Sequence, residues 1–285
     1  DTEDTTSSDT QTGTGGTGST TQPGEGELQI VSIVINYLFD DGSLAFEPYG
    51  ATVAKGSDFV RTVASPVVVG FEPFIRMVSA DGTSAEYVDA KNVVFDYASV
   101  TENITINVIY LPAIVQYQVH HHFQDLYTDE YPTDPNRTTV KEGLNGSVVP
   151  ENLAFTPEEL PGYTALPYEK LKIAADGSTV VEIRYERKYY LVDFDMRGGY
   201  GVEPVYTRFE SELGVNQPIR HGYVFDRWQL VSFGGNAPSP AEETLYDINP
   251  TSSGTPKTIK VPAANLSYRA VWITQLANYT MVFWR

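Results

Sequence analysis

The sequence predicts a mainly β protein with little helix, made of three tandem small modules in an elongated array. Hydrophobic residues make up 41% of the 285 residues and aromatic residues 12%, which is enough to build packed cores. The 23 Gly and 18 Pro are spread along the chain, as is typical of short strands joined by turns. From Leu28 onward one succession of segments recurs three times at a period of roughly 80 residues, which indicates a repeat protein.

Residues 1–27 form a separate segment at the start of the chain. They include six acidic residues and no basic, aromatic or aliphatic residue. Such a segment cannot bury enough apolar surface to offset the entropy lost on ordering. We expect a disordered Thr/Ser/Gly/Asp linker, with a glycosylated stalk as the alternative.

Each repeat opens with a segment in which apolar and polar residues alternate. This pattern predicts a strand with one buried face. The three segments are IVSIVINYLF (30–39), IVQYQVHHHF (114–123) and YYLVDFDM (189–196).

Each repeat continues with a polar turn and a Gly-aromatic step, and ends with a closing strand. The Gly-aromatic steps are Gly70-Phe71, Gly162-Tyr163 and Gly222-Tyr223, and the closing strands are expected at 102–113, 178–188 and 266–275. Glycine permits a backbone conformation closed to other residues, and the adjacent ring can cover a small core. The predicted modules are therefore 28–112, 113–188 and 189–276.

Helix signals are few. In TPEEL (156–160), Thr156 can cap a helix of one or two turns, which Pro161-Gly162 then ends. At the end of the chain, residues 277–285 resemble the opening strand of a further module. Because the sequence also begins without Met, we expect it to be part of a longer protein.

Composition excludes several classes of function. With 19 Lys+Arg against 37 Asp+Glu the net charge is −18, which disfavours nucleic acid and anionic membrane surfaces as partners. No apolar run approaches the ~18 residues that span a bilayer, so membrane insertion is not expected. The absence of cysteine removes disulfides, thiol catalysis and cysteine-ligated metals.

Two groups of residues could bind a cation. On a strand, His120 and His122 share one face and His121 points to the other, but no acidic residue lies two positions away to complete a metal site. We therefore expect no metal and interpret the histidines as polar positions on an exposed face. The acidic loops at Asp40-Asp41-Gly42 and 125–134 lack the EF-hand pattern, so turn-forming loops are favoured over calcium sites.

No catalytic pattern stands out, and the protein is predicted not to be an enzyme and to need no cofactor. A Gly-x-Ser-x-Gly elbow is absent, and paired carboxylates for sugar hydrolysis need a deeper cleft than small modules provide. The aromatic residues are assigned mainly to cores, with sugar or protein binding as the alternative. The residues expected to be structural are Gly162, Tyr163, Gly222, Tyr223, Phe225 and Trp228.

The third repeat resembles the internalin B-type B repeat, also called the Listeria-Bacteroides repeat, of bacterial surface proteins. The matching segments are VDFDMRGGYG (192–201), RHGYVFDRWQ (220–229), which carries the Gly-Tyr-x-Phe-x-x-Trp signature, and YRAVWI (268–273). This chain departs from that family by inserting a segment rich in Pro, Ser, Thr and Asn at 231–257.

The first two repeats are similar, more loosely, to mucin-binding-protein-type repeats, through their opening strands, LPGY (160–163) and the closing strand at 180–187. Together the two resemblances imply β-grasp-like modules in a Gram-positive surface protein that carries a signal peptide and a wall anchor. They imply an extracellular location at the cell surface or cell wall.

The expected function is that of a non-catalytic, monomeric stalk or spacer of an adhesin. The first alternative is an adhesive module that binds a host glycan or a mucin-like glycoprotein. The insertion at 231–257 would favour it, since specificity often lies in long loops on a rigid scaffold. The second alternative is an accessory region of a large secreted enzyme.

Overall fold

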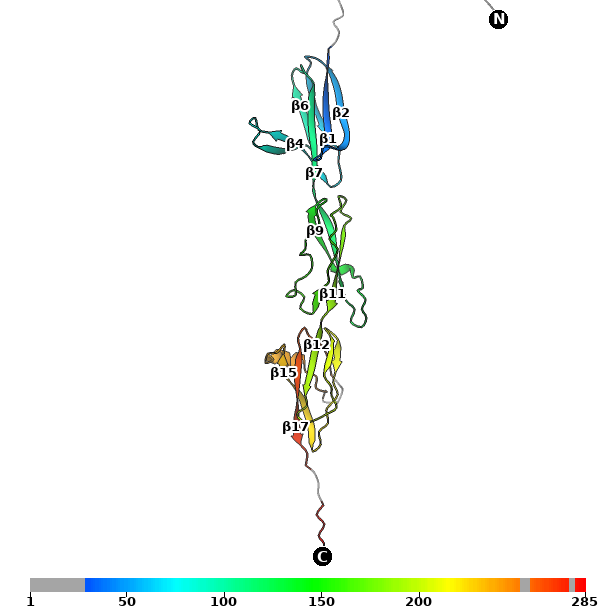
Figure 1. Ribbon diagram of the computed structural model, residues 1–285, viewed down its shortest axis with the longest axis vertical. Coiled ribbons are helices and arrows are strands. Elements are labelled where there is room, and N and C mark those ends of the chain that lie inside the picture. The colour runs from blue at the N-terminus through cyan, green and yellow to red at the C-terminus, as the bar shows by residue number, and fades with distance from the viewer. Residues whose placement is uncertain (1–28, 252–256, 277–279) are drawn as a thin grey trace, which may run out of the picture. The chain divides into compact units, whose positions relative to one another are not determined.

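The computed structural model describes residues 29–251, 257–276 and 280–285 (Figure 1). The mainly β prediction is confirmed, because the described residues contain seventeen strands and one short α-helix. No helix in these ranges is long and apolar enough to cross a membrane. The N-terminal linker expected at 1–27 lies outside the described residues.

The chain forms two compact units. The first comprises the described residues up to Pro66 together with Pro73–Ile109, and the second comprises Val67–Glu72 and the residues from Tyr110 onward. The segments 113–188 and 189–276, which the sequence predicts as separate modules, thus belong to one unit.

Unit 1 is built on a five-stranded sheet, sheet 1, in the order β2-β1-β7-β4-β5. In β1, Val31, Ile33 and Ile35 are buried on the core face, as the alternating sequence requires. A two-stranded sheet of β3 and β6 contributes Val93 and Phe95 to the buried residues. The strands are β1 (Ile30–Phe39), β2 (Leu44–Ala54), β3 (Phe59–Ala64), β4 (Phe71–Val78), β5 (Ala85–Asp89), β6 (Asn92–Tyr97) and β7 (Ile104–Pro112).

Unit 2 contains two four-stranded sheets. Sheet 2 has the order β10-β11-β8-β9, and sheet 3 has the order β13-β12-β17-β15. Their elements are β8 (Ile114–Phe123), η1 (Pro135–Arg137), β9 (Thr138–Leu144), β10 (Tyr163–Ala165), β11 (Val180–Arg187), β12 (Tyr189–Asp195), β13 (Val205–Arg208), β14 (Glu212–Gly214), β15 (Tyr223–Phe233), α1 (Pro240–Leu245), β16 (Thr258–Lys260) and β17 (Leu266–Thr274).

The three main sheets share one plan. In each, the opening strand lies between the second strand and the closing strand. The opening and closing strands run parallel in sheet 2 (β8 with β11) and in sheet 3 (β12 with β17). In sheet 1, hydrogen bonds join Ser32 to Asn103 and Asn36 to Asn107, both 71 residues apart, as expected for parallel strands. The finer assignment to the β-grasp fold stays a prediction.

Consecutive sheets are joined by very short links. Only Ala113 separates β7 from β8, and only Lys188 separates β11 from β12. Within unit 2, Lys188 donates its backbone N–H to the carbonyl of Gly162 (3.0 Å) and accepts from Phe209 N (2.8 Å). Arg187 pairs with Glu210 at 2.5 Å. The junction between sheets 2 and 3 is therefore held by hydrogen bonds from both sides.

The segment 231–257 is more than a loop, which corrects the sequence interpretation. β15 runs on to Phe233, and α1 begins at Pro240 with Ser239 and Glu242 forming a capping box. Ile248 is buried in the core of sheet 3, and Asn249 exchanges hydrogen bonds with the backbone of Trp228 (2.6 and 2.9 Å). Part of the segment thus completes the fold.

Two further expectations concern local structure. Residues 156–160 form one hydrogen-bonded turn and no helix, although Thr156 and Glu159 make reciprocal contacts of 2.8 and 3.3 Å. The Pro161-Gly162 pair stops the turn from extending. At the end of the chain, residues 277–279 lie outside the described residues, and 280–285 form no strand and are exposed.

Candidate functional site

The three consecutive histidines on β8 are divided between the two faces of sheet 2. The even-numbered residues of β8 point to the outer face, the face away from the core. His120 and His122 therefore lie on the outer face, while His121 lies on the core face with Tyr117 and Val119.

A carboxylate joins the two outer histidines from the neighbouring strand. Glu182 of β11 is the register partner of His120, and its side chain also lies on the outer face. Its Oε1 atom is 3.3 Å from Nδ1 of His120, and its Oε2 atom contacts Nε2 of His122. One ligand atom from each of the three side chains lies within 4.8 Å of the others. The sequence interpretation missed Glu182 because it lies 60 residues beyond His122.

A neighbouring amide contacts the other ring nitrogen of His120. Its Nε2 atom is 3.1 Å from Oε1 of Gln118, and a carbonyl oxygen can only accept a hydrogen bond. With a proton on Nε2 the ring can donate to Gln118, and Nδ1 is directed at Glu182.

His122 is not an exposed polar residue, which corrects the interpretation of the tripeptide as part of an exposed face. Its side chain is 11% exposed, whereas that of Glu182 is 52% exposed. The Nδ1 atom of His122 is buried and has no hydrogen-bond partner among the described residues. Within the described residues, the polar contact of the His122 side chain is thus the one with Glu182.

His121 has a structural environment. Nδ1 is 2.8 Å from the hydroxyl of Tyr185, Nε2 is 3.2 Å from Oγ1 of Thr139, and the ring stacks on Phe155 at 4.5 Å. Burial, together with the nearby Lys141 and neighbouring histidines, lowers the pKa of this imidazole. The neutral form is favoured, as its packing among aromatic rings requires.

An aromatic cavity of about 480 Å³ opens beside His121. Phe123 and Tyr163 meet edge to face at 4.9 Å, Phe209 meets Tyr163 at 5.5 Å, and Arg137 lies over the Phe123 ring at 4.0 Å. The volume is in the range of small-molecule sites, and the cavity combines flat rings with a guanidinium group.

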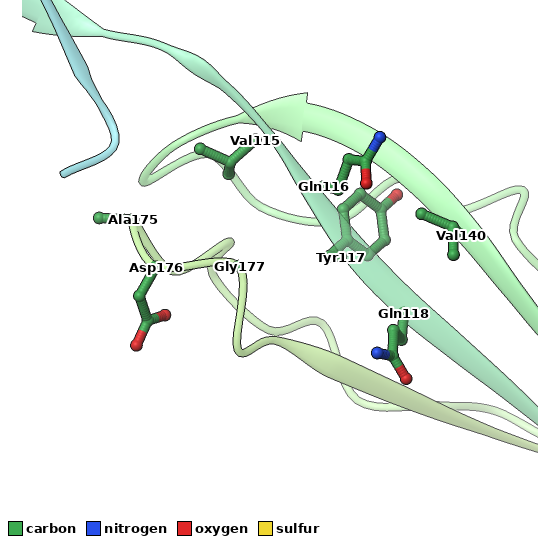
Figure 2. Close-up of a pocket in the computed structure, with 8 residues that line it drawn as sticks. All are labelled: Val115, Gln116, Tyr117, Gln118, Val140, Ala175, Asp176 and Gly177. Carbon is green, nitrogen blue, oxygen red and sulfur yellow. The ribbon is translucent and has the colours of Figure 1, made fainter.

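A second cavity, of about 470 Å³, lies between β8 and the turn before β11 (Figure 2). Figure 2 shows Gln116 and Gln118 on the strand and Asp176 on the turn. Asp176 accepts a hydrogen bond from the backbone of Ser178 (3.0 Å), so its carboxylate organises the turn. This cavity gathers no nucleophile or paired acid and base, but it borders the Gln118 amide that contacts His120.

The acidic loops use their carboxylates in turns. Asp41 accepts from the backbone N–H and the hydroxyl of Ser43 (2.9 and 2.6 Å), and these bonds lower its pKa. Asp125 accepts from the backbone of Tyr127 and Thr128 (2.8 and 3.0 Å), which lowers its pKa. In the same loop Asp129 pairs with Arg208.

The Gly-Tyr step of sheet 2 lies at the junction with Phe209. A Cβ atom on Gly162 would lie 2.2 Å from the Phe209 ring, so close approach requires glycine here. Tyr163 is buried and belongs to the core of sheet 2.

Of the corresponding residues of sheet 3, some lie at a turn and others belong to the core. Gly222 has a φ of 76°, a conformation that favours glycine, and the Tyr223 ring lies under the Arg220 guanidinium at 3.8 Å. Trp228 is 3% exposed and contacts Phe225 at 5.4 Å. Its Nε1 atom is buried without a partner among the described residues.

Comparison with known proteins provides little guidance. No family model matches the chain, and no curated protein matches it. Among solved structures, a similar chain is the Bacillus anthracis TIE protein, with 8% identity and a TM-score of 0.24 over 89% of this chain and 46% of that one. The chain thus spans less than half of that protein, and so low a TM-score carries no argument.

Proposed function

We propose that this chain is a non-catalytic extracellular repeat region that acts as a stalk or spacer in a bacterial surface protein. The observation that carries the proposal is the single-residue link, Lys188, between sheets 2 and 3 of unit 2. A spacer transmits position from one end to the other, and so short a link removes the freedom that a flexible linker would add between these two sheets.

The junction at Lys188 supports the same function. Its backbone bonds to Gly162 and Phe209, and the Arg187–Glu210 pair, restrict the link from both sides. The side chain of Arg187 is 12% exposed and that of Glu210 is 44% exposed, so the pair is partly shielded from solvent. These contacts stabilise one arrangement of two sheets, which is what a spacer requires.

Small-angle scattering of the full chain tests the spacer proposal. A compact protein of this length has a radius of gyration of about 19 Å. We expect a clearly larger value, with a pair-distance distribution that does not change between low and high salt. A value near 19 Å would overturn the proposal.

An adhesive function is the second candidate, and the cavity beside Phe123 favours it. Aromatic rings stack on the apolar faces of sugars, and the Arg137 guanidinium can donate to hydroxyl or carboxylate oxygens. The segment 231–257 supports an adhesive function less strongly than a free loop would, because Ile248 and Asn249 take part in the fold of sheet 3.

A glycan and host-protein array, probed with the full chain and with Arg137→Ala, distinguishes the two functions. If the chain is a spacer, we expect it to bind no ligand on the array with an affinity tighter than the micromolar range. Submicromolar binding to one defined ligand, lost in Arg137→Ala, would establish the adhesive function. Deletion of 231–257 is an unsuitable test, since it removes the buried Ile248.

A further inference from the structure

We propose that His120, His122 and Glu182 form a binding site for a divalent transition-metal ion, with Zn²⁺ as the ion to test. The ligand atoms are Nδ1 of His120, Nε2 of His122 and a carboxylate oxygen of Glu182, which lie within 4.8 Å of one another. Two imidazoles, one carboxylate and an open fourth position are a ligand set that suits zinc.

The orientation of the His120 ring provides the first argument. Nδ1 of His120 is directed at Oε1 of Glu182 at 3.3 Å, while Nε2 of the same ring lies 3.1 Å from Oε1 of Gln118. A cation at Nδ1 and a ring proton on Nε2 would satisfy both contacts of this imidazole at once. The hydrogen bond from Nε2 to Gln118 is also the outer contact that usually orients a metal-binding imidazole.

The surroundings of the site provide the second argument. Arg184 lies opposite His122 in the register of β8 and β11, but its guanidinium lies 5.7 Å from the centroid of the Tyr131 ring. The ion pairs that Glu182 makes within the described residues are those with the two histidines. The carboxylate thus lacks a permanently charged partner in this part of the chain.

Accessibility and rigidity also suit an ion. Glu182 is half exposed, which leaves a path for the metal and room for a water ligand, while His122 is held almost fully buried. The three side chains come from adjacent strands with a fixed register, so the site is largely organised before the ion arrives. Once Nε2 of His122 binds the metal, Nδ1 of the same ring must carry the ring proton. Nδ1 is buried and has no hydrogen-bond partner among the described residues, so this unpaired donor limits the affinity for the metal.

Isothermal titration of the full chain with Zn²⁺ at pH 7.5 tests the site. We expect one ion per chain with a micromolar dissociation constant. Glu182→Gln and His120→Gln should weaken binding by roughly 100-fold, and Gln118→Ala by about 10-fold, as for loss of an outer contact. The control is His221→Gln, which changes the histidine outside the tripeptide and should bind as the parent does.

Two further measurements make the result unambiguous. Circular dichroism without metal checks that Glu182→Gln is folded, which is expected because this side chain is half exposed. Nitrogen shifts of the imidazoles should change at Nδ1 of His120 and Nε2 of His122. An absence of binding, or binding that Glu182→Gln and His120→Gln leave unchanged, would overturn the proposal. Ca²⁺ binding with equal affinity would also overturn it, because calcium prefers oxygen ligands.

Discussion

Sheets 2 and 3 have the same strand order but carry different chemistry on the outer face of their central strand pair. In sheet 3, Asp195 of β12 accepts from Arg269 of β17 at 3.2 Å and pairs with Arg197 at 3.0 Å. In sheet 2 the equivalent position between β8 and β11 holds two imidazoles and Glu182. One carboxylate has built-in cations, whereas the other has partners that are neutral unless protonated.

Sheet 1 provides a third case of the same pair of strands. There Asn36 donates to Asn107 at 2.9 Å, so the contact is neutral and complete without any ion. The fold therefore accepts an amide pair, an ion pair or a histidine–carboxylate cluster at one location. The strand order does not determine which residues occupy this location. The histidine–carboxylate cluster is therefore specific to the sequence of sheet 2.

The largest expected effect tests whether sheets 2 and 3 have separate cores. Trp228 is buried between Phe194 and Phe225 in the core of sheet 3. Trp228→Ala should lower the free energy of unfolding of sheet 3 by about 3–5 kcal/mol. Hydrogen exchange should increase in β12 and β17 and stay unchanged in β8 and β11. Equal loss of protection in both sheets would show a single cooperative core.

The next prediction concerns the outer faces directly. Zn²⁺ at 100 times its dissociation constant should stabilise sheet 2 by about 2.7 kcal/mol and leave sheet 3 unchanged. His120→Lys gives Glu182 a fixed cation, as Arg269 does for Asp195, so the metal response should disappear. Without metal, its stability should stay within about 1 kcal/mol of the parent. Thermal unfolding with and without Zn²⁺ measures both effects, and a response that survives His120→Lys would contradict the comparison.

A third prediction concerns the junction that the two sheets share. In Gly162→Ala the new Cβ would collide with the Phe209 ring, which should destabilise the junction by about 1–3 kcal/mol. Gly50→Ala is the matched control, because a Cβ there meets nothing within 4 Å. Urea unfolding compares the two variants, and equal stabilities would show that Phe209 moves aside freely.

The smallest effect is expected at the ion pair of sheet 3. Asp195 and Arg269 are both about half exposed, and Asp195 keeps Arg197 as a partner. Arg269→Ala should therefore cost no more than about 1 kcal/mol in urea unfolding. A loss well above 2 kcal/mol would mean that the ion pair is a main stabilising contact, and the two outer faces would then differ in importance as well as chemistry.

Much of the fold could be predicted because each opening strand alternates apolar and polar residues. The structure places β1 at Ile30–Phe39 and β8 at Ile114–Phe123, the bounds that the pattern predicts. The sequence interpretation missed helix α1, although Ser239, Pro240 and Glu242 form a start signal, because the helix is only six residues long and lies in a segment rich in Pro and Ser. The same kind of signal at Thr156 gives only a turn because Pro161 follows at once.

The candidate site was predicted only in part, for a physical reason. Alternation places His120 and His122 on one face, but the third group comes from a strand 60 residues away. Its place depends on a parallel register that aligns Glu182 with His120, and a shift of one residue would turn that side chain to the core. Local spacing carries no information about such a register.

The central strand pairs also determine how sheets 2 and 3 respond to mechanical tension. The chain enters sheet 2 at Ile114 and leaves it at Arg187, which are opposite ends of two parallel, adjacent strands. A pull on these ends slides β8 along β11 and loads their ladder of hydrogen bonds together, whereas a hairpin pulled from its open end loses them one by one. The arrangement of β12 and β17 in sheet 3 gives the same shear geometry. Each of these two sheets therefore has a geometry that resists tension along the chain, and Lys188 alone links them.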